Sequence, residues 1–145
     1  MTVVVDASVL VKVFVDEPGS DIARDVLERS EVAIAPAHVF GEVGEVLARR
    51  FGAGEVSRAQ LDLVVAVLPG MIAVVSLEEI LGLAIDIAVA TKASVYDTLY
   101  VATAVRRNVP LVTADQRLVD RLGGTIWANL VRPLGQSGKT GEPAP

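Results

Sequence analysis

The sequence contains no cysteine and a single histidine, His38. Thiol catalysis, cysteine-based zinc sites and disulfide-stabilised secreted folds are therefore excluded, as is any site that needs two histidines from one chain. Metal chemistry in this protein must rest on carboxylates. The first residues, MTVVVD, also lack the basic segment and the small-residue cleavage site of a secretory signal, so we expect a cytoplasmic protein.

Long apolar runs and an excess of positive charge are also missing. The longest uncharged stretch, residues 63–77, contains Pro69 and Gly70 and is shorter than the ~20 residues that a membrane span requires, so we expect no membrane association. The formal net charge is −5, which argues against binding of nucleic acid by broad neutralisation of its phosphates. A role on nucleic acid would have to rest on a local site.

Apolar residues are abundant, since they make up 52% of the 145 residues, whereas charged residues make up 21%. This length and composition indicate one domain with a large core. Short apolar runs predict strands at residues 3–5, 32–35, 71–75 and 111–112, and a further short strand at 125–127. Helical periodicity predicts helices at residues 8–15, 21–29, 39–51, 58–68, 78–91, 95–107 and 116–122.

The alternation of strands and helices predicts an α/β domain with three layers, in which helices flank a central, mostly parallel sheet. Pro36, residues 52–54, the Pro69–Gly70 pair and residues 123–124 are expected in turns. From residue 135 the sequence reads GQSGKTGEPAP and offers almost nothing to bury. We therefore expect an ordered domain over residues 1–130 and a disordered tail over residues 131–145.

Two aspartates follow predicted strands. Asp6 ends the first apolar run, in VVVDAS, and Asp115 ends the last strong one, in LVTAD. The carboxyl ends of parallel strands meet at one edge of a sheet, which is where open α/β sheets build their sites. For either residue, an equally good interpretation is that it only caps the amino end of the helix that follows.

Two glutamates lie on the predicted helix at residues 39–51, in the sequence FGEVGEVL. Glu42 flanks the apolar stripe of this helix and can reach a cleft at the edge of the domain. Glu45 points away from the stripe, and the better interpretation is a solvated charge with Arg49 as its partner four residues later.

A third aspartate, Asp97, lies in SVYDTLYVATA, on a predicted helix that is apolar nearly all round and therefore buried. It could instead complete a capping box begun by Ser94. If the four acids converge, two carboxylates 4 Å apart repel by ~4 kcal/mol at an effective dielectric constant of 20, so the cluster requires cations. Oxygen ligands without histidine or cysteine favour Mg²⁺ or Mn²⁺, and the chemistry that follows is phosphodiester hydrolysis.

The four segments VVVDAS, FGEVGEVL, SVYDTLYVATA and LVTAD together resemble the PIN-domain family, and within it the VapC-type toxins of toxin–antitoxin pairs; the resemblance covers residues 1–130. It implies a PIN-like fold and a ribonuclease that inhibits translation until a cognate antitoxin protein blocks its site. It also implies a homodimer. The acids that it assigns to metal binding and catalysis are Asp6, Glu42, Asp97 and Asp115, which would hold Mg²⁺, with Mn²⁺ as a second option, and activate water for attack on the RNA phosphodiester.

The resemblance also draws attention to polar neighbours of these acids. Ser8 and Thr113 match such neighbours and could hold metal-bound water. Asp120 lies near a position where some members carry a further acid, although a surface charge is an equally good interpretation. Solvated surface is favoured over RNA contact for Lys12, His38, Arg106 and Arg107. Core or dimer contacts are favoured over base stacking for Tyr96 and Tyr100, and a core position is favoured for Trp127.

Three other functions compete with this interpretation. A phosphatase of the haloacid-dehalogenase type needs a second aspartate two residues after the first, where this chain has Ser8. A receiver domain needs an acidic pair after its first strand and a late lysine at a strand end, and neither is present. The strongest rival is a catalytically silent PIN-like module that only binds or scaffolds, against which the four intact acids argue.

Overall fold

A computed structural model describes residues 1–135 of the chain. Its strands are β1 (Thr2–Val5), β2 (Val32–Pro36), β3 (Ala73–Val75), β4 (Leu111–Thr113) and β5 (Val131–Pro133). Its helices are α1 (Ala7–Phe14), α2 (Ser20–Arg29), α3 (Val39–Gly52), α4 (Arg58–Met71), α5 (Leu77–Thr91), α6 (Val95–Arg107) and α7 (Gln116–Leu122), with a 3₁₀ turn at Ala128–Leu130. Every predicted helix is present, with ends that differ from the prediction by at most three residues.

The strands form one sheet in the order β3-β2-β1-β4-β5, and every neighbouring pair is parallel. The first strand lies at the centre, where Val4 pairs with Ile34 of β2 on one side and with Leu111 of β4 on the other. From β1 the chain first builds outward through β2 and β3 and then crosses to β4 and β5. The strand order therefore reverses between β1 and β4, which is the place where open parallel sheets hold their ligands.

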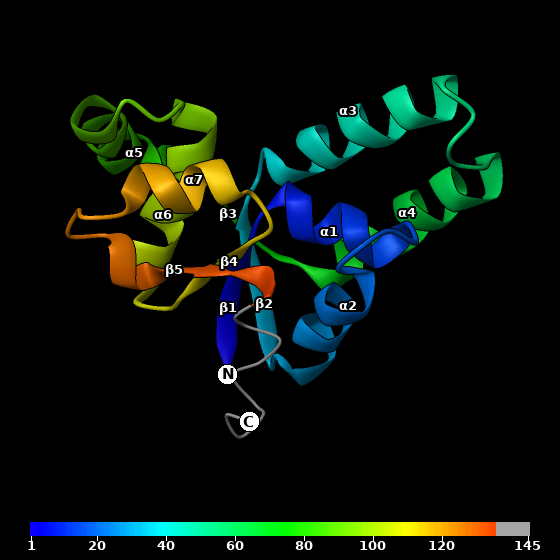
Figure 1. The fold of residues 1–145 in the computed structure, drawn as a ribbon, viewed down its shortest axis with the longest axis horizontal. Helices are drawn as coiled ribbons and strands as arrows, with labels where there is room; N and C mark the ends of the chain where they lie inside the picture. The colour runs from blue at the N-terminus through cyan, green and yellow to red at the C-terminus, as the bar shows by residue number, and fades with distance from the viewer. Residues whose placement is uncertain (136–145) are drawn as a thin grey trace.

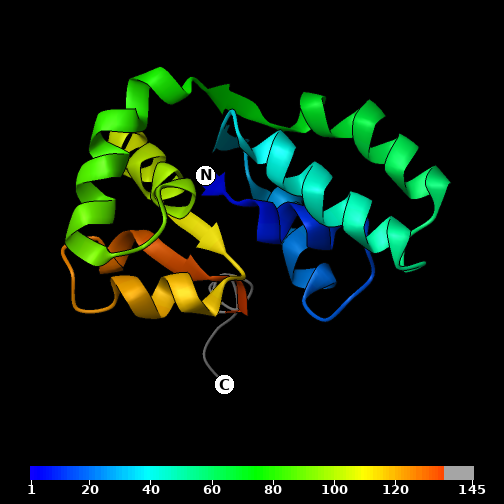
Figure 2. The ribbon, with the colours of Figure 1, turned by 90° about the horizontal axis from the view of Figure 1, so that it is seen from above.

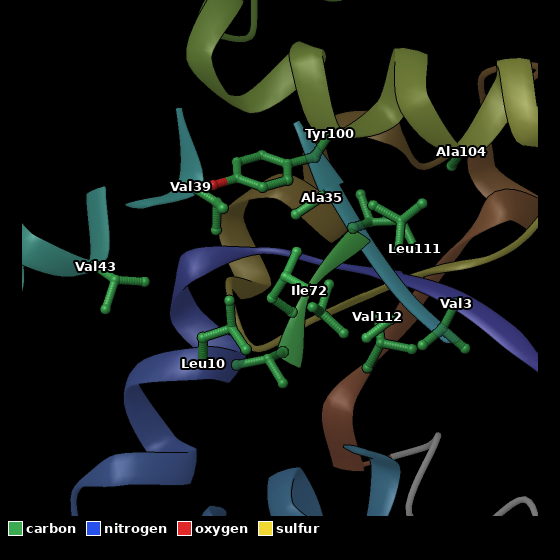
Figure 3. Close-up of a cluster of buried hydrophobic side chains, with 14 of the residues drawn as sticks. Val3, Leu10, Ala35, Val39, Val43, Ile72, Tyr100, Ala104, Leu111 and Val112 are labelled. Carbon is green, nitrogen blue, oxygen red and sulfur yellow. The ribbon is translucent and has the colours of Figure 1, made fainter. Parts of the chain in front are cut away.

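Helices cover both faces of the sheet, as the predicted three-layer α/β architecture requires. Figure 1 shows α1 and α2 on one side of the strands and α5 and α6 on the other, while α3 and α4 extend together beyond the sheet. The view from above shows the same separation (Figure 2). Val3, Val4 and Val5 of β1 are at most 2% exposed, because layers on both sides cover the strand. Figure 3 shows how side chains from α1, α3 and α6 meet those of the sheet in one core.

Three local predictions were wrong. Pro36 was expected in a turn but is the last residue of β2, where it pairs with Val75 of β3. Pro69 and Gly70 lie inside the last turns of α4 rather than in a turn between elements. The carbonyl that loses its donor to Pro69 belongs to Val65, which is 76% exposed, so water can satisfy it. No strand forms at residues 125–127, where the hydroxyl of Thr125 donates to the carbonyl of Leu122 in a turn and Ile126 is 86% exposed.

The predicted domain boundary at residue 130 is too early. Strand β5 pairs with β4 through Val131 and Leu111, and Leu134 after it is buried. An isolated strand of three residues carries a weak sequence signal, but its burial against β4 makes it part of the domain. The remainder of the expected tail, residues 136–145, lies outside the described residues. Among residues 1–135, no helix combines the length and the apolar character needed to cross a membrane.

Candidate active site

Asp6 and Asp115 lie side by side at the carboxyl edge of the sheet, because β1 and β4 are parallel neighbours. Each caps the helix that follows. The carboxylate of Asp6 accepts from the backbone N–H of Val9 at 3.3 Å, and that of Asp115 accepts from the N–H of Arg117 at 3.0 Å. The capping interpretation is confirmed for both residues, and the caps fix the orientation of two carboxylates that also border one pocket.

Two hydroxyl groups hold Asp6 in place. Ser8 donates to Oδ1 of Asp6, and Thr113 donates to its Oδ2. The same hydroxyls accept from the chain beyond β4, since the N–H of Ala114 donates to Ser8 Oγ at 2.9 Å and the N–H of Asp115 donates to Thr113 Oγ1 at 3.0 Å. In this arrangement Ser8 and Thr113 position the carboxylate, and their protons are committed to Asp6 rather than to a water.

Glu42 enters the site from the first turn of α3. Its Oε1 accepts a 2.5 Å hydrogen bond from the hydroxyl of Tyr100 on α6 and lies 3.3 Å from Nε2 of His38. The imidazole of His38 also lies 2.9 Å from the carbonyl of Tyr96, and its ring packs on Tyr100 with centroids 4.7 Å apart. The hydroxyl of Tyr100 therefore fixes one oxygen of Glu42, and the ring of His38, held by the carbonyl of Tyr96, lies beside the same oxygen.

Asp97 enters from the first turn of α6, where the hydroxyl of Ser94 accepts from its backbone N–H at 3.1 Å. Ser94 is thus the N-cap, as expected. Within residues 1–135, however, the carboxylate of Asp97 makes no return bond to the Ser94 backbone, so the capping box is incomplete. The side chain of Asp97 faces the site instead.

All four acids line one pocket, which we call the acidic pocket. Its volume is about 130 Å³, and it is bordered by Asp6, Ala7, Ser8, Glu42, Asp97, Tyr100 and Asp115. The chain thus brings together four carboxylates from four separate segments. A second pocket of about 300 Å³ adjoins it and shares Asp97 and Asp115.

The carboxylates of this pocket influence one another. The pKa of Asp6 is raised from 3.8 to about 6: burial is the largest cause and the negative charge of Asp115 adds to it, against the hydrogen bonds from Ser8 and Thr113, which lower it. Burial also raises the pKa of Asp97, and Asp115 again adds to the effect. Negative charge in this pocket is therefore unfavourable without a cation.

A comparison of the chain with known families decides its classification. The family model of the PIN domain matches residues 3–123, which is most of the chain. The chain belongs to the PIN domain family. No curated protein sequence matches it significantly.

Solved structures share the fold of this PIN domain. PAE2754 from Pyrobaculum aerophilum has a TM-score of 0.66 at 20% identity, covering 93% of this chain and 85% of that chain. VapC20 from Mycobacterium tuberculosis, a toxin that cleaves the sarcin–ricin loop, has a TM-score of 0.64 at 18% identity, covering 86% and 97%. A toxin–antitoxin complex from Klebsiella pneumoniae has a TM-score of 0.61 at 14% identity, covering 91% and 97%.

The donor set of the PIN domain suits a hard divalent cation, because it offers only carboxylate and hydroxyl oxygens. Across residues 1–135, no three acidic or histidine side chains lie close enough together to enclose a metal ion by themselves. Mg²⁺ does not need such a cage, since it usually binds through one or two carboxylates and completes its shell with water and substrate phosphate. The acidic pocket fits that mode of binding.

Other residues singled out in the sequence have different positions. Glu45 is exposed, as expected, although within the described residues Arg49 forms no ion pair with it. Asp120 accepts from the side chain of Gln116 on the exposed face of α7 and does not line the acidic pocket. Arg107 pairs with Glu79.

Sequence reasoning missed the part that two aromatic residues play. Tyr100 is 2% exposed and was expected only as a core or dimer contact, whereas its hydroxyl reaches Glu42 (Figure 3 shows it directed toward the start of α3 at Val39). His38 was expected at a solvated surface, yet its side chain is only 11% exposed. A buried tyrosine generally finds a partner for its hydroxyl, and that rule could have pointed to an acid.

Proposed function

We propose that this PIN domain is a divalent-metal-dependent endoribonuclease of the VapC type, and that it acts as the toxin of a toxin–antitoxin pair. The convergence of Asp6, Glu42, Asp97 and Asp115 on one pocket at the carboxyl edge of the sheet carries the proposal. The structural similarity to a toxin that cleaves the sarcin–ricin loop and to a toxin–antitoxin complex supports it.

The chain's own residues prepare the site for Mg²⁺ or Mn²⁺. Asp6 is fixed through both oxygens by Ser8 and Thr113, and Glu42 is fixed through one oxygen by Tyr100. These contacts orient the carboxylates before a ligand arrives, so little ordering remains to be done on binding. When bound, the cation would lower the pKa of a coordinated water and offset negative charge on the phosphate.

The raised pKa values favour the same function. Asp6 and Asp97 carry their negative charges at a free-energy cost, which a cation of charge +2 removes. An antitoxin can exploit the same cost by inserting a basic side chain among the carboxylates, where it would satisfy buried charge and exclude metal. We therefore propose that antitoxin and Mg²⁺ compete for the acidic pocket, and that the protein acts in the cytoplasm.

We also propose a homodimer in which α5 takes part. Leu81, Ile85 and Val89 recur every four residues along this helix and are 46%, 44% and 78% exposed. Residues with this spacing share one face of a helix, and an apolar face of this kind suits contact with a second copy. Light scattering over a range of concentrations tests this point, and a monomer at every concentration would contradict it.

Cleavage of single-stranded RNA in Mg²⁺ and in EDTA tests the proposed activity. The wild-type protein should yield fragments only with the metal, and Asp97→Asn should abolish cleavage at an unchanged fold, because it removes a ligand charge at constant shape. Asp62→Asn is the matched control, since Asp62 is an exposed acid of α4 that pairs with Arg58 and lies outside the acidic pocket. A wild-type protein that binds the RNA but does not cleave it, whether Mg²⁺ or Mn²⁺ is supplied, would instead be a silent binding module.

A further inference from the structure

Three basic side chains gather beside the acidic pocket. Lys92, Arg117 and Arg121 line the adjoining pocket of about 300 Å³, which we call the basic pocket. It shares Asp97 and Asp115 with the acidic pocket, so the two pockets are neighbours. Its volume lies at the lower end of the range of about 300–1,000 Å³ that is typical of ligand sites.

The charges of the basic pocket are poorly neutralised by the protein. Six basic side chains outside this pocket pair with acids: Lys12, Arg24, Arg29, Arg50, Arg58 and Arg107. Within the described residues, Arg49, Arg106 and Arg132 do not, but none of these three lines either pocket. In the basic pocket, neither Lys92 nor Arg121 forms an ion pair within residues 1–135. Arg117 lies 3.7 Å from Asp115 with 94% of its side chain exposed, and such a pair is weak. A chain of net charge −5 thus keeps three cations available at one place.

The backbone around Lys92 is held in an unusual conformation. Lys92 ends α5 with φ of 63°, in the left-handed region that glycine or asparagine usually occupies at the end of a helix. Its carbonyl accepts from the guanidinium of Arg121 at 3.3 Å, which ties this turn to α7. The contact places the side chains of Lys92 and Arg121 on the same pocket, although a lysine in this conformation costs free energy.

We propose that the basic pocket binds a phosphate of the RNA strand next to the phosphate that is cleaved. The inference rests on the proposed nuclease function and adds the residues that position the strand. Arginine matches phosphate oxygens with two parallel donors, and lysine adds a point charge. Because the two pockets are neighbours that share Asp97 and Asp115, one strand can place a phosphate at the metal and the next phosphate on Lys92, Arg117 and Arg121.

An RNA strand fits this layout better than an acidic peptide does. The carboxylates of Asp97 and Asp115 border the basic pocket and repel a chain of glutamates. A nucleic acid strand meets the acids only where a cation bridges them to its phosphate. The arrangement also explains how an acidic protein can hold RNA, since a few local phosphate contacts replace a basic surface.

Steady-state cleavage kinetics in Mg²⁺ test the assignment. Lys92→Gln, Arg117→Gln and Arg121→Gln should each raise KM about tenfold with little change in kcat, which is the loss expected for one charge-assisted hydrogen bond. The Lys92→Gln/Arg121→Gln double variant should also reduce the salt dependence of kcat/KM, by ~0.7 in log–log slope for each phosphate that is no longer neutralised. Arg49→Gln is the control, because Arg49 is a basic residue at the surface of α3 outside both pockets.

A binding measurement separates failure of this inference from failure of the proposed function. Fluorescence anisotropy with a labelled single-stranded RNA oligonucleotide in EDTA reports on the basic pocket even if the protein cleaves nothing. Weaker binding by the double variant than by Arg49→Gln supports the inference. Equal RNA affinity and equal KM would overturn it, and so would a labelled oligoglutamate peptide that binds the wild-type protein more tightly than the RNA does.

Discussion

The hydroxyl of Tyr100 donates a 2.5 Å hydrogen bond to Oε1 of Glu42 and thereby joins α6 to the first turn of α3 across the acidic pocket. The same oxygen lies 3.3 Å from His38. Among residues 1–135, the second oxygen of Glu42 accepts no hydrogen bond, so it remains available to a cation. The negative charge of Glu42 and burial together keep Tyr100 protonated, because burial raises its pKa and the glutamate raises it further.

Removal of the Tyr100 hydroxyl should weaken metal binding and catalysis while the packing of the aromatic ring stays unchanged. We expect Tyr100→Phe to lower the free energy of unfolding by about 1.5–3 kcal/mol, the range for a hydrogen bond to a charged group, and to weaken Mg²⁺ affinity and kcat together. Tyr96→Phe is the control, since its ring is 66% exposed. Denaturation and metal titration of both variants provide the measurement. Identical metal affinity in Tyr100→Phe and the wild-type protein would show that the bond does not orient Glu42.

The two glutamates of α3 should differ sharply in function. Glu42→Gln should reduce the cleavage rate and the metal affinity together, because Glu42 lines the acidic pocket. Glu45→Gln should change stability by less than about 0.5 kcal/mol and leave turnover near that of the wild-type protein, because Glu45 is exposed. Parallel kinetics and metal titrations on the pair decide the matter, and a larger loss at Glu45 would exclude Glu42 as the ligand.

Cation binding should stabilise the fold. A site that is absent from the unfolded chain adds about 2.7 kcal/mol at a metal concentration one hundred times Kd, so the Tm should rise with Mg²⁺ or Mn²⁺. Asp115→Asn should raise the Tm without metal and reduce the response to metal, because it removes a charge that raises the pKa values of Asp6 and Asp97. Asparagine also caps a helix well, so α7 should stay intact. An unchanged metal response in this variant would exclude Asp115 from the site.

Asp6 should impose a pH dependence on the metal-free protein. Its pKa is about 6 in the folded state and 3.8 without the protein environment, so between these values the folded state holds a proton that the unfolded chain has released. Stability should therefore fall as the pH rises through this window, by up to about 3 kcal/mol in total. Chemical denaturation in EDTA should show a steeper fall for the wild-type protein than for Asp6→Asn. Equal slopes would contradict the assignment.

Local sequence signals were sufficient for most of the fold, and the four acids singled out in the sequence line one pocket. Periodicity located α6 at its exact bounds, and the position of Asp6 and Asp115 after apolar runs placed both at one edge of the sheet. Strand β5 was missed because its three residues give no alternation to detect, and its burial depends on pairing with β4. A short stretch of sequence does not show which distant segment it will pack against, so a strand that depends on such packing cannot be predicted from it.

The same limit explains which parts of the site were missed. The bond from Tyr100 to Glu42 joins residues 58 positions apart, and the basic pocket combines the end of α5 with α7. Lys92, Arg117 and Arg121 are ordinary charges when each is considered in its own segment. Arg106 and Arg107 attracted attention instead because they end the helix that carries Asp97, but neither lines either pocket.

The central place of β1 has a consequence for synthesis of the protein. The strand that carries Asp6 is made first, yet the hydroxyl that holds it belongs to Thr113, which is 107 positions later in the chain. Contacts of such long range form only after both segments have left the ribosome. A nascent chain therefore lacks the assembled acidic pocket for most of its translation. Under the proposed function, cleavage of RNA would begin only when almost the whole chain exists.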